Sequence, residues 1–293
     1  MNHSMVRRVA FLVALVQCAA GSAWSLAEPD MNAARALYQR TEYRQALQLL
    51  EPAEPKSPAS HALLGQCYYR LEDYKKASEA FQKAVDAEAD NSVYWDWLGR
   101  AYGRRAETSS FFTAPSYASK ARQYFEKAVQ LNSENLDATD DLFEYYLEAP
   151  GFLGGGKDKA AELSERVRQR APGKYHSMQA RLAEKDKKMD LAEREWRAAV
   201  EAAPNEPGRV IDLARFLARQ GRHNESDARF DQARRLAPES VQLKFQRART
   251  YIDAKRNLEQ ARTLLEEYLK APLTPDDPPR RDAQELLRRI PTG

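Results

Sequence analysis

Small and large apolar residues alternate with polar ones along this chain in a pattern that recurs about every 34 residues. Each occurrence has a small residue at i, a large one at i+4 and a second small one at i+7, which is the spacing of one helix face. Self-similarity at this period predicts a solenoid of helical hairpins. The triplets are Ala46/Leu50/Ala53, Ala77/Phe81/Ala84, Ala121/Phe125/Ala128, Ala192/Trp196/Ala199 and Ser226/Phe230/Ala233.

A preceding helix in each unit carries a pattern of its own. Its clearest residues are Leu64, Gly65 and Tyr68 in one unit and Trp95, Leu98, Gly99 and Tyr102 in the next. The two halves together resemble the tetratricopeptide repeat, W-x2-L-G-x2-Y followed by A-x3-F and a closing Pro. Pro204 and Pro238 stand at the closing position. A generic helical bundle is the alternative, but it would not repeat both halves at this period.

This resemblance implies an all-α fold, a right-handed α-α superhelix of about seven helical hairpins followed by a C-terminal capping helix. We expect one elongated array over 28–275 and a capping segment over 276–293, because a last repeat leaves an apolar face exposed. The cap has Ala283, Leu286, Leu287 and Ile290 on one face. The predicted units are 27–57, 58–91, 92–135, 136–172, 173–206, 207–240 and 241–275.

The N-terminus has the pattern of a signal peptide. Arg7 and Arg8 precede an apolar run too short to span a bilayer, and small residues follow it. We expect residues 1–27 to be removed, which places the protein in the periplasm or outside the cell. A retained anchor is one alternative, and a lipoprotein attached at Cys18 is a weaker one, because Gln17 fits that motif poorly.

Charge and cysteine content narrow the classes of function. Removing residues 1–27 takes away two basic residues and no acidic ones, so the formal net charge falls from +3 to +1. This balance does not favour nucleic acid as a partner, and no later segment is apolar enough to cross a membrane. Cys67 would be the one cysteine left, and we interpret it as a small buried residue rather than a reactive thiol.

Two units are longer than the others. Gly99 and Ala121 are 22 positions apart, against 12 for the equivalent Gly65 and Ala77, and a shorter insertion ends at Gly156. Insertions in such arrays often form a binding face. We expect the inserted residues to form loops, and Phe111, Phe112, Phe152 and Leu153 are apolar residues in them. They either fold back to cover the core or form an exposed insertion edge that contacts a partner.

The second insertion contains a distinctive loop, with Ala149-Pro150, then Gly154-Gly155-Gly156, then Lys159-Ala160. It resembles a group of exported bacterial tetratricopeptide proteins with an AP…GGG…KA loop, which implies a bacterial envelope protein but no activity. The glycines could cradle phosphate before a helix. They lack the Gly-Lys-Ser/Thr spacing, so a turn with glycine-specific backbone angles at Gly155 and Gly156 is the preferred interpretation.

The first helix of each hairpin should line the concave groove of the superhelix. One groove position per repeat forms a ladder dominated by arginine, and arginine suits bidentate contacts to carboxylates. The ladder favours an acidic or C-terminal peptide; alternatively, the arginines pair with neighbours such as Asp96, Asp140 and Glu184. The positions are Arg35, Gln66, Arg100, Glu144, Arg181, Arg215 and Arg249.

Catalytic chemistry finds little support in the sequence. The three histidines beyond residue 27, His61, His176 and His223, are far apart, and no zinc or nucleophile motif is present. We therefore expect no cofactor, no metal and no enzyme, but a scaffold that binds a protein or peptide in the cell envelope. The alternative is a structural subunit that associates with itself; the sequence leaves the oligomeric state open.

Overall fold

The computed structural model describes residues 30–53 and 56–291 of the 293-residue chain. The predicted signal peptide at 1–27, with Cys18, lies outside these residues. The described part is all helical, with fifteen α-helices, one 3-10 helix and no strand. The helices are α1 (Met31–Gln39), α2 (Tyr43–Leu50), α3 (Pro58–Arg70), α4 (Tyr74–Ala87), α5 (Ser92–Thr108), α6 (Ala114–Leu131), α7 (Leu136–Glu148), η1 (Gly151–Leu153), α8 (Lys157–Glu165), α9 (Pro172–Lys185), α10 (Met189–Ala202), α11 (Pro207–Arg219), α12 (His223–Leu236), α13 (Val241–Asp253), α14 (Leu258–Lys270) and α15 (Arg280–Arg288).

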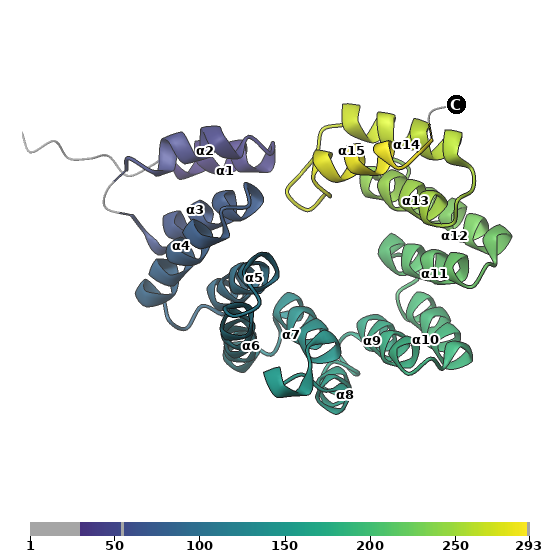
Figure 1. Cartoon of the computed structure of the whole chain (residues 1–293), viewed down its shortest axis with the longest axis horizontal. Coiled ribbons are helices and arrows are strands. Elements are labelled where there is room, and N and C mark those ends of the chain that lie inside the picture. The colour runs from purple at the N-terminus through teal and green to yellow at the C-terminus, as the bar shows by residue number, and fades with distance from the viewer. Residues whose placement is uncertain (1–29, 54–55, 292–293) are drawn as a thin grey trace, which may run out of the picture.

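The α-helices α1 to α14 form seven antiparallel hairpins, α1 with α2 through α13 with α14, each packed on the next. The first helix of each hairpin lies on the inside of the curve and the second on the outside (Figure 1). The curve is nearly a full circle in this view, so that α1 and α15 face each other across its open end (Figure 1). The predicted all-α superhelix is confirmed. The helices fall two to each predicted unit, apart from α9, which starts one residue early.

Side-chain and proline signals set where several helices begin. Asn91 and Asn135 accept hydrogen bonds from the amides of Val93 and Ala138 at 3.1 Å, which satisfies free donors at the start of α5 and α7. Ser57 caps α3 in the same way. Proline occupies the first turn of α3, α6, α9 and α11, where its missing amide costs nothing.

The triplets form the contacts between the two helices of a hairpin. Every member of the five triplets is at most 7% exposed. A Cβ added to Gly65 would lie 2.7 Å from the ring of Phe81, and one added to Gly99 would lie 2.6 Å from the ring of Phe125. The glycine of the first helix therefore receives the large residue of the second. This close approach is the physical basis of the repeat pattern.

In the longer third unit, the inserted residues do not form the long loop that the sequence suggested. Most of its extra residues lengthen the two helices: α5 has 17 residues and α6 has 18, against 13 in α3 and 14 in α4. Only residues 109–113 connect them. The added turns are held together by Arg105, whose guanidinium lies 4.9 Å from the ring centroid of Tyr102 and 4.2 Å from that of Tyr117.

The capping helix α15 covers the end of the last hairpin. Ala283, Leu286 and Ile290 are buried in one cluster with residues of α13 and α14, and Leu287 is partly buried beside them. The hydroxyl of Tyr268 donates to the carbonyl of Pro278 at 2.5 Å, which ties the preceding segment to α14. Residues 280–288 thus have the capping position that the sequence predicted.

Candidate functional site

A hollow on the inner surface lies between α7, α9 and α11. Its volume is about 600 Å³. Trp196 of α10 and Met178 of α9 contribute buried apolar surface, and the remaining lining is mostly charged. The lining residues are Asp140, Leu147, Glu148, Lys174, Ser177, Met178, Arg181, Glu184, Lys185, Trp196, Arg209, Asp212, Arg215 and Arg219. We call this hollow the central pocket.

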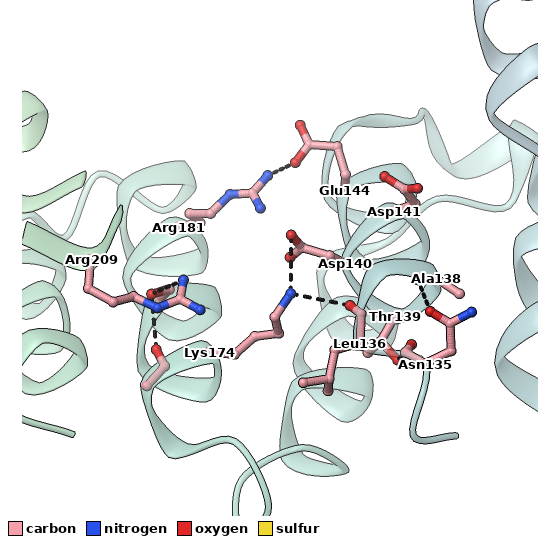
Figure 2. A network of polar contacts seen from close by, with 12 residues as sticks. Asn135, Leu136, Ala138, Thr139, Asp140, Asp141, Glu144, Lys174, Arg181 and Arg209 are labelled. Carbon is pink, nitrogen blue, oxygen red and sulfur yellow. Dashed lines mark hydrogen bonds and ion pairs between the residues drawn. The ribbon is translucent and has the colours of Figure 1, made fainter. Parts of the chain in front are cut away.

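Ion pairs join α9 to α7 along one wall of the central pocket. Lys174 lies 3.4 Å from Asp140 and also donates to the carbonyl of Leu136 at 3.2 Å. Arg181 pairs with Glu144, as Figure 2 shows for this network. Further along the same face, Lys185 contacts Glu148 at 2.7 Å. These pairs hold two adjacent repeats in register.

The other wall joins α9 to α11. Arg209 donates to the hydroxyl of Ser177 at 3.2 Å, and Arg219 lies 2.7 Å from Glu184. The indole of Trp196 also donates to Glu184, at 2.7 Å. Each of these contacts orients a side chain at the pocket surface. The wall is therefore preorganised by interactions within the protein.

Arg215 is the least compensated cation of the central pocket. Its nearest carboxylate is Asp212, one turn away at 3.7 Å. Burial lowers the pKa of Arg215, and the neighbouring Arg219 and Arg249 add to the effect, although Asp212 opposes it. Burial also raises the pKa of Asp212, with Arg215 acting in the opposite direction. A ligand carboxylate reaching Arg215 would supply the partner that it lacks.

The predicted arginine ladder is divided among several environments. Arg181 and Arg215 share the central pocket. Arg35 and Gln66 line a second hollow, formed by α1, α3 and α5, that we call the N-terminal pocket. Arg249 contacts Asp253 at 3.8 Å beside α15. Position by position, the ladder follows the inner helices, but it does not form one continuous surface of free guanidiniums.

Arg100 is committed to two carboxylates. It lies 3.0 Å from Asp96 on its own helix and 2.5 Å from Asp141 on α7. Asp96 is 3% exposed, and burial raises its pKa to about 8 against the opposing charge of Arg100. The cluster sits between two repeats. Its contacts favour a structural role for Arg100 over ligand binding.

The apolar residues of the two insertions lie mostly in solvent and do not pack over the core. Phe111, Phe112 and Phe152 are 86%, 91% and 83% exposed, so of the two alternatives the structure contradicts covering of the core for these three. Leu153 is half-buried. The added residues between α5 and α6 close their own gap by forming helix, which leaves the two phenylalanines at the tip. Their rings meet edge to face with centroids 6.0 Å apart.

The glycine loop before α8 is closed on itself. The amides of Gly154, Gly155 and Gly156 donate to the carbonyls of Gly151, Pro150 and Tyr146 at 2.8–3.2 Å. None of the three is directed at an anion, which contradicts the phosphate interpretation. Gly154 has the left-handed backbone, with φ of 85°. Gly155, for which we expected such an angle, is instead required by space, since a Cβ would lie 1.9 Å from the carbonyl oxygen of Ala149.

Several pocket residues were missed by the sequence analysis. Lys174 and Lys185 lie on the same face of α9 as Arg181, seven residues before it and four after it, and Arg219 follows Arg215 by one turn. Reading one position per repeat overlooked them. A helical-face search around each ladder position would have found them.

Other candidate chemistry is sparse. Cys67 is fully buried, and burial raises its pKa to about 12, so its thiol has structural character. Over residues 30–53 and 56–291, no group of three His, Cys, Asp or Glu side chains is arranged as a metal site. Within the same ranges, none of the helices combines the length and the apolar character that crossing a bilayer requires.

Comparison with known families supports the repeat pattern directly. Residues 37–100 and residues 211–278 each match a family described as tetratricopeptide repeat. The Sol locus transcriptional repressor of Clostridium acetobutylicum is 30% identical over 124 residues. The matching region is 36% of this chain and 35% of that protein, so this chain spans about a third of the length of its curated relative.

Solved structures share the architecture. A tetratricopeptide repeat protein from Parabacteroides merdae is 15% identical, with 86% of this chain and 90% of that chain covered and a TM-score of 0.55. A thermophilic tetratricopeptide repeat protein from Thermus thermophilus is 20% identical, with 64% and 96% covered and a TM-score of 0.50. At these identities the likeness is one of fold alone.

Proposed function

We propose that this chain, of which residues 37–100 and 211–278 match the tetratricopeptide repeat, is a non-enzymatic scaffold that binds a protein segment in its central pocket. A fold of this kind serves protein–protein interaction. The pocket offers a curved surface of inner helices with oriented polar groups above buried Trp196 and Met178. These features suit an extended peptide, whose backbone carbonyls and side chains both need partners.

The observation that carries the proposal is the state of Arg215. This guanidinium is half-buried and has only a loosely placed carboxylate, at 3.7 Å. Arg181, in the same pocket, lies 5.1 Å from the centroid of the Phe143 ring, which orients its planar head. Two oriented guanidiniums on adjacent inner helices favour a ligand with carboxylates. The proposed partner is therefore an acidic protein segment.

Charge reversal at Arg215 tests this assignment. A fluorescent oligoglutamate peptide should bind the wild-type protein more tightly than its oligoglutamine counterpart. Arg215→Glu should weaken oligoglutamate binding about tenfold or more, since a charge-assisted contact becomes repulsive. The matched control is Arg234→Glu on α12, because Arg234 has the same i,i+3 aspartate contact at 3.7 Å but is 67% exposed. Equal affinity in wild type and Arg215→Glu would contradict the assignment.

The insertion edge supports a second candidate function, self-association as a structural subunit. Phe111 and Phe112 are large apolar side chains almost fully in solvent, which is costly unless another surface covers them. Light scattering should then find an oligomer for the wild type and a monomer for a Phe111→Ser/Phe112→Ser variant with an unchanged melting temperature. Val93→Ser, at another exposed apolar position, is the control. A monomeric wild type would eliminate this candidate.

We also propose that the scaffold works in the bacterial cell envelope. The basic residues Arg7 and Arg8 and the apolar run after them support export. The mass of the protein recovered from its native cells distinguishes the alternatives. Cleavage after Ala27 gives a chain beginning at Glu28, lipid attachment at Cys18 adds acyl mass, and a retained anchor leaves the full length.

A further inference from the structure

The N-terminal pocket is lined partly by residues from the opposite end of the chain. Its volume is about 380 Å³, and α1, α3 and α5 contribute most of its wall. Pro275 and Asp276 complete the wall. Figure 1 shows the segment before α15 reaching across the open end of the curve toward α1 and α3. Two regions far apart in the sequence therefore meet inside the groove.

This contact is more than a chance approach of two surfaces. Pro275 is buried, although it lies in a connecting segment. A smaller hollow next to it is lined by Thr41 and Tyr43 from the first hairpin together with Leu273 and residues 277–280 from the tail. Arg281 of α15 also forms an ion pair with Glu72, in the turn between α3 and α4.

The electrostatics of the contact are complementary. Arg70, at the end of α3, borders both hollows, and its Nε is buried without a hydrogen-bond partner among the described residues. Asp276 lines the first hollow and Asp277 the second. Burial raises the pKa of Tyr38, and Asp276 adds to the increase, whereas Arg70 opposes it. The Asp276 carboxylate thus acts on the same phenol as the Arg70 guanidinium.

The tail segment is shaped before it meets the groove. The amide and hydroxyl of Thr274 both donate to Asp277 at 2.9 Å, which forms a closed turn. Arg280 donates to the carbonyl of Ala271 at 2.9 Å and fastens the segment to its own hairpin. Prolines at 275, 278 and 279 restrict the backbone further. A preordered acidic segment loses little entropy on docking.

We propose that residues 273–279 are an internal ligand of the N-terminal pocket, and that their docking closes the array into a ring. The segment has the chemistry of its site, because it is a turn that carries a proline-flanked pair of aspartates. Pro275 and Asp276 line the N-terminal pocket together with Arg35, Arg70, Tyr38 and Trp97. An outside peptide of the same chemistry competes with it, so the pocket binds such a partner only when the ring opens. This inference is independent of the central pocket.

The experiment uses the full chain without residues 1–27 and a fluorescent peptide with the sequence of residues 271–279. Asp276→Arg places a cation next to Arg70 and should open the ring. The opened variant should bind the peptide about tenfold more tightly than wild type, because a site that is closed nine-tenths of the time loses that factor in apparent affinity. Adding Arg70→Glu to the opened variant should abolish the gain.

A charge swap distinguishes loss of the docking contact from a general destabilisation of α15. Arg281→Glu alone should open the ring a few-fold, since an exposed ion pair is worth little and now becomes a repulsion. Glu72→Arg combined with Arg281→Glu restores an opposite pair and should return both the scattering radius and the peptide affinity to wild-type values. A variant that merely destabilised α15 would not be rescued in this way.

Scattering and peptide binding together can support or overturn the proposed closure of the ring. Small-angle scattering should give a larger radius of gyration for Asp276→Arg than for wild type, together with the gain in peptide binding. An unchanged radius, equal peptide affinity in wild type and opened variant, or absence of binding to the opened variant would each overturn the proposal. Loss of oligoglutamate binding at Arg215→Glu is a separate result, because that site lies on other repeats.

Discussion

Asp96 is a carboxyl group whose ionisation is opposed by its burial. It is 3% exposed, and its Oδ1 is buried and accepts no hydrogen bond from the described residues. Burial raises its pKa to about 8, above the value of about 4 that an unfolded chain gives. The folded protein therefore holds this proton more tightly than the unfolded chain. Its stability falls as pH rises from about 4 through about 8.

Asp96→Asn should remove this part of the pH dependence. The amide resembles the protonated carboxyl in shape and stays neutral, so the variant should lose less stability between about pH 5 and about pH 8 than wild type. The difference in slope is at most about 1.4 kcal/mol per pH unit. Urea unfolding across this range measures it. Asp190→Asn, at an exposed site on α10, should keep the wild-type slope; parallel curves for Asp96→Asn would refute the prediction.

Single residues also show what the sequence could predict. Gly65 and Gly99 were predictable as helix crossings, because a repeated spacing reports a local packing rule that each unit obeys. Asp96, one turn before Arg100 on the same helix, was among the expected partners, but the partners of Arg100 and Arg181 on other helices were not predictable from the spacing. They depend on which carboxylate of the neighbouring repeat faces each guanidinium, and that follows from the rotation between repeats. Asp141 and Glu144 emerged only in three dimensions.

At the scale of the element, the turns inside the hairpins share one backbone device. A left-handed residue lies two positions after the end of the first helix in five hairpins, and one of the five is glycine. The residues are Thr41, Glu72, Lys187, Gly221 and Lys255. A residue with a side chain is strained by about 1–2 kcal/mol in this conformation. In four of these turns, a left-handed residue other than glycine therefore lowers the stability of the fold.

Lys187→Gly should relieve the strain between α9 and α10. Glycine adopts a φ of 60° without cost but loses more entropy on folding, so the net gain should be about 0.5–1 kcal/mol. Thermal and urea unfolding measure the gain. The same substitution at a helical position is the control: Lys83→Gly, at an exposed interior position of α4, should destabilise by about 1 kcal/mol. A loss of stability at Lys187→Gly would show that the turn is not strained.

The lengths of α5 and α6 could not be predicted from the repeat pattern. Extra residues between Gly99 and Ala121 suggested a loop, since a period counts positions and does not say what the inserted ones form. The stacking of Arg105 on Tyr117 stabilises the extra turns of both helices, so the inserted residues form helix instead of a loop. The exposed tip at Phe111 and Phe112 follows from this extension. A contact between two inserted segments has no signature in a repeat pattern.

At the scale of the whole molecule, contacts at the two ends of the array affect how far a local defect spreads. A solenoid repeat contacts only its neighbours, so a local defect normally spreads no further than the adjacent units. The contact of Arg281 with Glu72 adds a link between the capping helix α15 and the second hairpin. The sequence predicted the cap but not this link, because closure depends on the sum of small rotations over all repeats.

Loosening α15 should therefore affect both ends of the chain. Leu286 is 5% exposed in the terminal cluster, and Leu286→Ala should cost about 2–5 kcal/mol there. Hydrogen exchange should speed up in α13 and α14, and to a lesser degree in α1 and the turn at Glu72, while α7 to α10 keep their protection. Leu163→Ala in α8 is the matched control, since Leu163 is similarly buried and its effect should remain within α6 to α9. Faster exchange confined to α13 and α14 would mean that the array behaves as an open solenoid, with stability passed only from neighbour to neighbour.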